Sequence, residues 1–154
     1  MKKIKLSQQG KNKGRFFAIV DEEDFEYLNQ WRWSYNARGY AVRGKDLLPL
    51  HRFLLQPPDN RMVDHINGNG LDNRKENLRI CESKDNQRNQ RKQQGTKSKY
   101  KGAYWHNQNK CWMAGITFES KFIFLGLFKT EHQAALCYDL WAADLFGKFA
   151  RLNF

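Results

Sequence analysis

Short apolar runs alternate with polar, turn-rich stretches along the whole chain, a pattern typical of small modules. In residues 1–50, two apolar runs flank a turn of Gly, Asn and Lys, and WRWSYNARGYAVR places aromatic residues among polar ones, which indicates short strands. Between them, DEEDFEYLNQW spaces Phe25, Leu28 and Trp31 at helical intervals. We therefore expect a small sheet with a short helix here.

The pattern of residues 51–93 predicts a strand, a loop, a second strand and a helix. The apolar segment HRFLL must end at Pro57 and Pro58. RMVDHI is then typical of a strand, NGNGLDNRKE of a loop with left-handed backbone positions, and NLRI of a second strand. Ser83 suits the N-cap of a helix through KDNQRNQRKQ. The polar stripe expected on that helix comprises Asn86, Asn89 or Gln90, and Gln93.

Residues 99–154 predict a three-stranded antiparallel meander followed by a helix. AYWHN, CWMAGITF and KFIFLGLF are rich in aromatic and branched residues and are separated by QNK and ESK turns. Thr130 should cap the helix in a capping box with Gln133, and Gly147 should end it. The apolar helix face expected to pack across the sheet comprises Ala134, Tyr138, Trp141 and Leu145. The sheet residues expected to meet it are Trp112, Ile116 and Leu125.

The net charge of the chain gives information about its binding partner. Its 27 lysines and arginines outnumber 16 acids, a net charge of +11, which favours a polyanionic partner. No run approaches the roughly 18 apolar residues of a membrane span, and MKKIKLSQQG lacks the apolar core of a signal peptide. We expect a soluble, cytoplasmic protein that makes no membrane contact.

Two further features of composition bear on organisation. Between Arg88 and Lys110 there are seven lysines or arginines and no acid, so we interpret residues 92–99 as a linker that orders on phosphate. The three cysteines have no Cys-x-x-Cys spacing, which argues against a zinc site or a disulfide framework. We expect Cys81, Cys111 and Cys137 to be reduced and mostly packed.

The Asp-His pair at the end of the RMVDHI run is the main candidate for chemistry. Phosphodiester hydrolysis needs a base to deprotonate water and a positive group to neutralise charge on the phosphate. A histidine and a divalent metal supply both, and Mg²⁺ takes only one or two protein oxygens. Asp64 and an asparagine of the following helix, Asn86, are suitable oxygen donors. The residues that follow His65 permit the bend that would bring the pair to one site.

The segment DHINGNGLDNRKENLR, continuing to KDNQRNQ, resembles the HNH nuclease family, which has a ββα-metal fold. The match is closest to the subgroup with asparagine in place of the last histidine. The resemblance implies that His65 is the general base and that Asp64 and Asn86 bind Mg²⁺ or Mn²⁺. It implies that Asn77 braces the loop and orients the histidine, with Asn73 as the alternative for that role.

The segment from SKYKGAYWHN to the closing NF resembles the AP2 DNA-binding domain through YKG, LGLF, AALCYD and WAAD. That family lays its sheet in the major groove of DNA. The resemblance implies DNA contacts at Lys101, Tyr104, Thr117, Phe122 and Phe124. Lys101 and Lys110 are the candidates for phosphate contacts, and the preceding basic segment adds Arg88, Arg91 and Lys92.

Residues 1–50 also resemble the region ahead of HNH units in phage-borne endonucleases, and the arginines and lysine expected to reach phosphate there are Arg38, Arg43 and Lys45. Trp31 and Trp33 suit a core better than a stacking platform. For His51 a structural or phosphate-contacting role is favoured over catalysis.

Together these features predict an α+β protein in which a ββα-metal unit follows a small β-rich region and precedes an AP2 domain. The expected division is a β-rich region over 1–50, the nuclease unit over 51–93, a basic linker over 94–99 and the AP2-like domain over 100–154. The expected activity is metal-dependent cleavage of double-stranded DNA by a monomer, of the homing type that phages and mobile introns carry. With one metal site, nicking is the first expectation. The alternatives are an AP2-type regulator with an inert HNH remnant and an RNA-directed nuclease.

Overall fold

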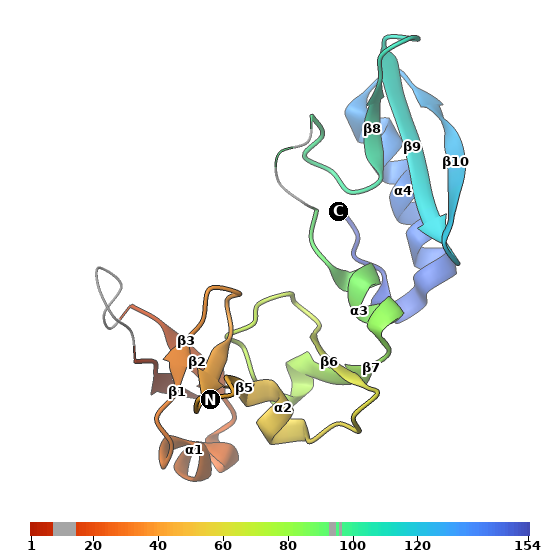
Figure 1. Ribbon diagram of the computed structural model, residues 1–154. Helices are drawn as coiled ribbons and strands as arrows, with labels where there is room; N and C mark the ends of the chain where they lie inside the picture. Colours follow the sequence, from red (N-terminus) through yellow and green to blue (C-terminus); the bar gives the residue numbers. More distant parts are fainter. Residues whose placement is uncertain (8–14, 93–94, 96) are drawn as a thin grey trace. The chain divides into compact units, whose positions relative to one another are not determined.

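The chain forms two compact units in the computed structural model, residues 1–86 and 87–154. The structure describes residues 1–7, 15–92, 95 and 97–154 (Figure 1). These contain several small sheets and four α-helices, so the mixed α and β content expected from the sequence is confirmed. The turn predicted around Gly10, Asn12 and Lys13 lies outside the described residues, as does part of the predicted linker.

The first unit opens with short strands and one helix, as predicted. β1 (Lys2–Lys5) pairs antiparallel with β2 (Phe17–Val20), and α1 (Glu22–Asn29) follows directly. A second sheet has the order β3-β4-β5, with β3 at Ser34–Tyr35, β4 at Ala41–Arg43 and β5 at Leu48–Pro49.

These elements share one hydrophobic core with the segment that follows them. Its largest fully buried side chain is Trp33, whose indole Nε1 donates to the carbonyl of Leu28 at 2.9 Å. Phe53, Leu54 and Leu71 pack against this core from further along the chain. Residues 1–50 are therefore joined to the predicted nuclease segment by packing.

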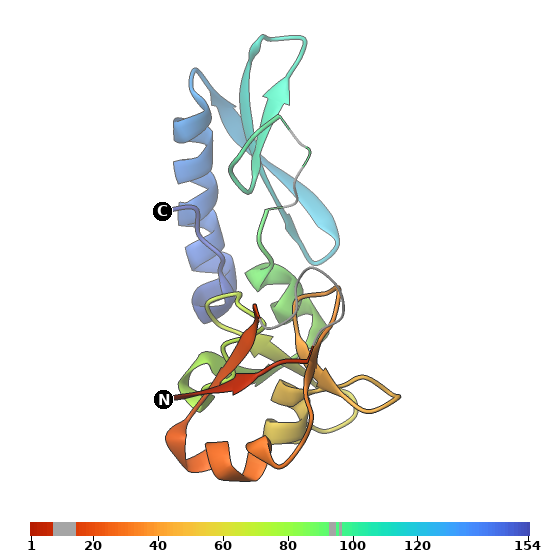
Figure 2. The ribbon, with the colours of Figure 1, turned by 90° about the vertical axis from the view of Figure 1, so that its left-hand side faces the viewer.

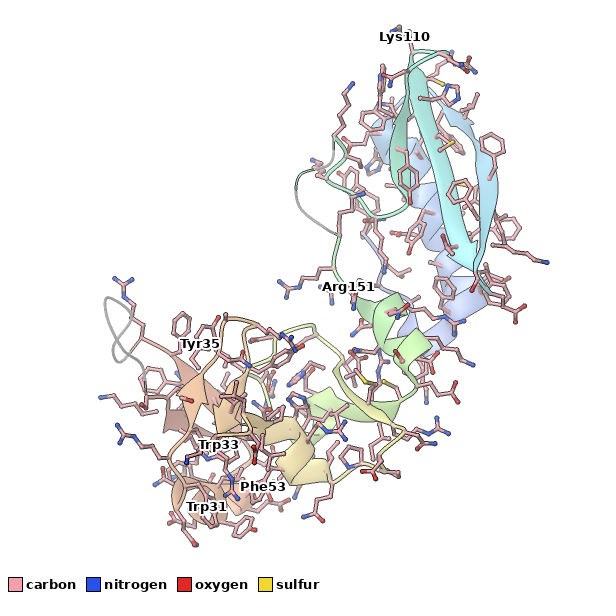
Figure 3. All side chains as sticks on the ribbon, viewed as in Figure 1. Trp31, Trp33, Tyr35, Phe53, Lys110 and Arg151 are labelled. Atoms are coloured by element: carbon pink, nitrogen blue, oxygen red, sulfur yellow. The ribbon has the colours of Figure 1, made fainter. Side chains whose placement is uncertain are left out.

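The other tryptophan of this region differs from its prediction. Trp31 is 42% exposed, and its ring lies beside the guanidinium of Arg43, with 4.0 Å from Cζ to the ring centroid. The same guanidinium lies 4.3 Å from the ring of Phe53. Phe53 itself lies close to Trp31 and Trp33 (Figure 3). Arg43 was expected to reach phosphate, but here its guanidinium packs among aromatic rings. This cation–π attraction is stronger for a partly desolvated arginine than for one in water.

The predicted order of strand, loop, strand and helix is confirmed in residues 51–86. α2 (Leu50–Leu55) ends at Gln56, whose backbone is left-handed with φ 44°, directly before the two prolines. β6 (Met62–His65) pairs antiparallel with β7 (Leu78–Cys81), and the loop between them closes with a 3₁₀ turn at Lys75–Asn77. α3 (Ser83–Asn89) follows two residues after β7.

The predicted bounds of α3 were wrong at both ends. The carbonyl of Glu82 accepts from the N–H groups of Asp85 and Asn86, each at 3.1 Å, so Ser83 lies within the helix and is not its N-cap. The helix ends at Asn89, so Gln90 is not part of a helical stripe, and Gln93 lies outside the described residues.

The early end of α3 has a tertiary cause. The ammonium of Lys101 donates to the carbonyls of Arg88 at 2.5 Å and Gln90 at 2.9 Å. A helix leaves its last carbonyls without partners, and a cation there satisfies them in place of a further turn.

The second unit is a meander covered by one helix, as predicted. β8 (Ala103–His106), β9 (Cys111–Phe118) and β10 (Lys121–Phe128) form an antiparallel sheet of order β10-β9-β8. α4 (Glu131–Phe146) runs along one face of it (Figure 2). The capping box of Thr130 and Gln133 is present, and Gly147 ends the helix with φ 50°. The predictions for the two ends of this helix are confirmed.

The core of this unit lies between α4 and the sheet. The residues that α4 buries are Ala134, Ala135, Tyr138, Asp139, Ala142 and Phe146. Trp112, Ile116 and Leu125 meet them from the sheet, as expected. The prediction was wrong for Trp141, which is 44% exposed. The buried face of α4 is formed mainly by alanines, and Trp141 does not lie on that face.

The last features of the fold concern the cysteines and the helices. Cys81, Cys111 and Cys137 are free thiols. None of the described helices has the length and apolar character needed to cross a membrane.

Candidate active site

Two neighbouring residues at the end of β6 hold the chemistry expected of this site. Asp64 lies opposite Arg79 in the register of β6 and β7, and both Nε (2.8 Å) and Nη2 (2.6 Å) of Arg79 donate to its Oδ2. His65, the last residue of the strand, accepts at its carbonyl from the N–H of Gly68 at 2.8 Å. The tight turn, with φ 69° at Gly68, bends the chain directly after the pair.

Asn77 fastens the loop that follows. Its Nδ2 donates to the carbonyl of Asp72 at 2.7 Å and to Oδ1 of Asn67 at 3.1 Å, and its Oδ1 accepts from the Asn67 N–H at 2.9 Å. Asp72, itself buried, accepts two hydrogen bonds from Arg74 at 2.8 Å. Asn67 and Asn77 thus close the loop on itself, and the buried side chains of Asn77 and Asp72 are both hydrogen-bonded.

Asn73 is the asparagine in contact with the histidine. Its side chain is fully buried, and its Oδ1 lies 3.5 Å from Nε2 of His65. Its backbone N–H donates to the carbonyl of Ile19 in β2 at 2.8 Å, so the loop is tied to the N-terminal sheet. The two roles expected of one asparagine are divided in this geometry: Asn77 contacts the loop, and Asn73 contacts His65.

A second histidine packs against the first. The rings of His51, from α2, and His65 lie edge to face with centroids 4.8 Å apart, and Tyr40 lies 5.1 Å from His51 and 5.8 Å from His65. His51 is only 7% exposed. Among the described residues, neither Nδ1 of His51 nor Nδ2 of Asn73 has a hydrogen-bond partner, although both atoms are buried.

Burial keeps both imidazoles in the neutral form. It lowers the pKa of His51 from 6.5 to about 3, and the charge of Arg52 and the electrostatic interaction with His65 act in the same direction. Burial also lowers the pKa of His65, opposed by the contact with Asn73 and by the charges of Asp64 and Asp72. A neutral imidazole at neutral pH can accept a proton, which a general base requires.

Cys81 is affected by both Asp64 and the backbone of Asn86. Burial and the charges of Asp64 and Asp85 raise the pKa of Cys81, while a hydrogen bond from the backbone N–H of Asn86 acts in the opposite direction. A carboxylate and an amide oxygen are hard donors that suit Mg²⁺ or Mn²⁺. The described residues contain no cluster of three or more His, Cys, Asp or Glu side chains, so a site built here would depend on asparagine and on oxygens from the substrate.

Comparisons with known proteins agree with this geometry. A family model described as HNH endonuclease matches residues 57–88. A protein of Acanthamoeba polyphaga mimivirus, named as an uncharacterized HNH endonuclease, is 34% identical over 157 residues, which cover 94% of this chain and 78% of the viral protein. The chain belongs to the HNH endonuclease family. It is therefore a nuclease.

Other relatives of this HNH endonuclease match only part of it. Two Arabidopsis thaliana proteins, named as an AP2-like ethylene-responsive transcription factor and an ethylene-responsive transcription factor, are each 39% identical over 59 residues. The matches cover 37% of this chain and 17% and 14% of the plant proteins. They give partial support to an AP2-like segment.

The residues expected to contact DNA in the second unit fall into two groups. Tyr104, Thr117, Phe122 and Phe124 are exposed, and the strand register places them on the sheet face away from α4. Lys110 is exposed in the turn between β8 and β9 (Figure 3). The others lie nearer the start of the unit: Arg88 has its guanidinium 4.8 Å from the ring of Phe146, Lys101 is bonded to carbonyls, and Arg91 and Lys92 line a pocket.

Sequence reasoning missed three residues of the nuclease site. Arg79 could have been found, because pairing the two predicted strands places it opposite Asp64. Asp72 was one acid among many polar loop residues, and Tyr40 is 25 residues from His65 in the sequence. Only tertiary packing brings Tyr40 to the histidines.

Proposed function

We propose that the chain is a metal-dependent endonuclease that hydrolyses phosphodiester bonds in double-stranded DNA, with cleavage by the first unit and DNA contact by the second. The main support is the environment of His65: a buried, neutral imidazole at a strand end, held between Asn73 and His51 in a member of the HNH endonuclease family.

His65 is the general base of the proposed reaction. It removes a proton from the water that attacks phosphorus, and its neutral form at neutral pH suits that step. Asn73 at 3.5 Å and the edge of the His51 ring fix the plane of the imidazole.

Asp64 and Asn86 are the proposed metal ligands. Arg79 grips Oδ2 of Asp64 with two donors and so sets the direction of the carboxylate. A bound Mg²⁺ or Mn²⁺ would neutralise charge that develops on the phosphate and the leaving oxygen. Because the second ligand is a neutral asparagine, we expect metal affinity to depend on the phosphate oxygens of bound DNA.

One proposed base per chain implies one cut per binding event. We expect a monomer to nick one strand, and a double-strand break to need a second event. The second unit, through its AP2-like sheet, is proposed to fix the position of the cut. This combination suits an endonuclease of a phage or mobile element, in keeping with the viral relative.

The test is cleavage of supercoiled plasmid and phage DNA with Mg²⁺ or Mn²⁺, with EDTA as the control. The expected result is open-circle product whose formation EDTA suppresses. Linear product at early times would show that both strands are cut together and would contradict nicking. If no substrate is cut in a metal-dependent way and the protein still binds a specific sequence, the result would favour an AP2-type regulator with an inert HNH remnant. Cleavage that RNA inhibits more strongly than duplex DNA does would favour the RNA-directed nuclease.

A further inference from the structure

A basic pocket lies within the second unit. Its volume is about 340 Å³, and three separate segments line it: residues 91–92, 99–101 and 151–153. Five of the lining side chains are cationic: Arg91, Lys92, Lys99, Lys101 and Arg151. The lining includes no Asp or Glu among the residues that the structure describes. Arg151 is labelled in Figure 3.

Cations held this close together repel one another. Burial and the neighbouring charge of Arg151 lower the pKa of Lys101 from 10.5 to about 8. Lys101 is therefore a partly desolvated cation beside a second cation, an environment that a bound anion would stabilise. The unit as a whole has the same sign, with eleven lysines and arginines against four acids.

A buried hydrogen-bond network fixes the walls of this pocket. The carboxylate of Asp139, on α4, accepts from the backbone N–H of Asn153 at 2.9 and 3.0 Å and from its Nδ2 at 2.8 Å. The side chain of Asn153 in turn brackets the backbone of Lys101: its Oδ1 accepts from the Lys101 N–H at 2.7 Å, and its Nδ2 donates to the Lys101 carbonyl at 3.0 Å. The segments that hold Arg151 and Lys99 are thereby set side by side.

Lys101 completes the frame. Its ammonium donates to the carbonyls of Arg88 and Gln90, so it holds the segment that supplies Arg91 and Lys92 to the opposite wall. The main part of Lys101 in this pocket is therefore to position other cations. Arg151 and Lys99 are cations on the other two lining segments.

We propose that the basic pocket binds a backbone phosphate of DNA, independently of base sequence, with Arg151 as a principal contact. The proposal rests on the proposed function, because it takes its anion from the nuclease's own substrate. Arginine presents a fork of donors that matches phosphate oxygens, and phosphate contacts of this kind fix the position of a protein on the duplex without reading bases. The basic pocket is joined to α4 through Asn153 and Asp139, so a phosphate bound in it would hold one point of the DNA backbone at the second unit.

The test measures binding to a duplex of random sequence in EDTA, so that no DNA is cut, over a range of salt concentrations. Arg151→Gln should weaken binding several-fold and reduce the slope of log K against log salt by about one, because each phosphate contact contributes about 0.9. Arg151→Lys should restore most of the slope. Lys129→Gln, which removes an exposed charge outside the pocket lining, should leave the slope nearly unchanged.

The outcomes separate this proposal from the rest of the account. Equal slopes for Arg151→Gln and wild type, with unchanged melting temperature and intact cleavage by wild type, would overturn the pocket and leave the nuclease proposal standing. A wild type that neither binds nor cuts DNA would overturn the proposed function itself. Inorganic phosphate at constant ionic strength tests free phosphate as the ligand: stabilisation of wild type but not of Arg151→Gln, without a change in DNA slope, would contradict the assignment to DNA.

Discussion

At the scale of single residues, the surroundings of His65 combine burial with contacts that fix its ring. Three side chains from different parts of the chain touch it: Asn73 from the loop, His51 from α2 and Tyr40 from the turn before β4. A neutral imidazole held in one orientation needs no rearrangement before it accepts a proton. Catalytic groups held this way gain from pre-paid orientation.

Removal of the His51 ring should slow cleavage by loosening His65. His51→Ala is expected to reduce the single-turnover rate by roughly 10- to 100-fold, because small misplacements of catalytic groups cost this much. His51→Phe keeps the edge contact and should retain much more activity. Rates should be measured at saturating enzyme, with DNA affinity determined separately in EDTA. Equal rates for His51→Ala and wild type would contradict a positioning role.

The buried histidines should also make stability depend on pH. The pKa of His51 is about 3 in the folded chain and close to 6.5 in the unfolded chain, so below pH 6.5 only the unfolded chain gains its proton. Stability is therefore full above pH 6.5 and falls with acidification, by up to about 1.4 kcal/mol per pH unit for each such histidine. His51→Phe should flatten this slope. Urea unfolding at several values between pH 5 and 7.5 measures it, and an unchanged slope would contradict the assignment.

At the scale of elements, the helices and strands that depend on nearby residues were predicted well, and the features that depend on tertiary contacts were not. The meander and the α4 cap follow from turn residues and side-chain caps a few positions apart, so sequence alone located them. The end of α3 depends on Lys101, 13 residues after Arg88, and the rotation of α4 depends on which side chains fit the sheet. The same limit applies to the site: Asp64 and His65 stand out in sequence, whereas the approach of His51 depends on how α2 packs.

The capping box offers a check on the α4 assignment. Thr130→Ala should lower the free energy of unfolding of the second unit by about 1 kcal/mol, because the N–H of Gln133 loses its acceptor. Thr130→Ser keeps the oxygen and serves as the matched control. Thermal unfolding of both variants gives the comparison. A loss as large for serine as for alanine would argue that the methyl group, and not the cap, stabilises the helix.

At the scale of the whole molecule, the proposed function assigns chemistry to the first unit and DNA affinity to the second. The first unit contains the proposed base and metal ligands, and the second has eleven of the 27 lysines and arginines with only four of the 16 acids. Variants of the first unit should therefore change the rate of cutting, and variants of the second should change binding and its salt dependence.

The most direct measurement compares wild type with His65→Ala in both properties at once: single-turnover cleavage with Mg²⁺, and duplex affinity in EDTA. His132→Ala, which removes an exposed histidine of α4, is the control. The account predicts that His65→Ala lowers the cleavage rate by at least about 100-fold while affinity stays within about twofold, as expected for loss of a general base. Cleavage retained by His65→Ala, or lost only in step with DNA affinity, would contradict it.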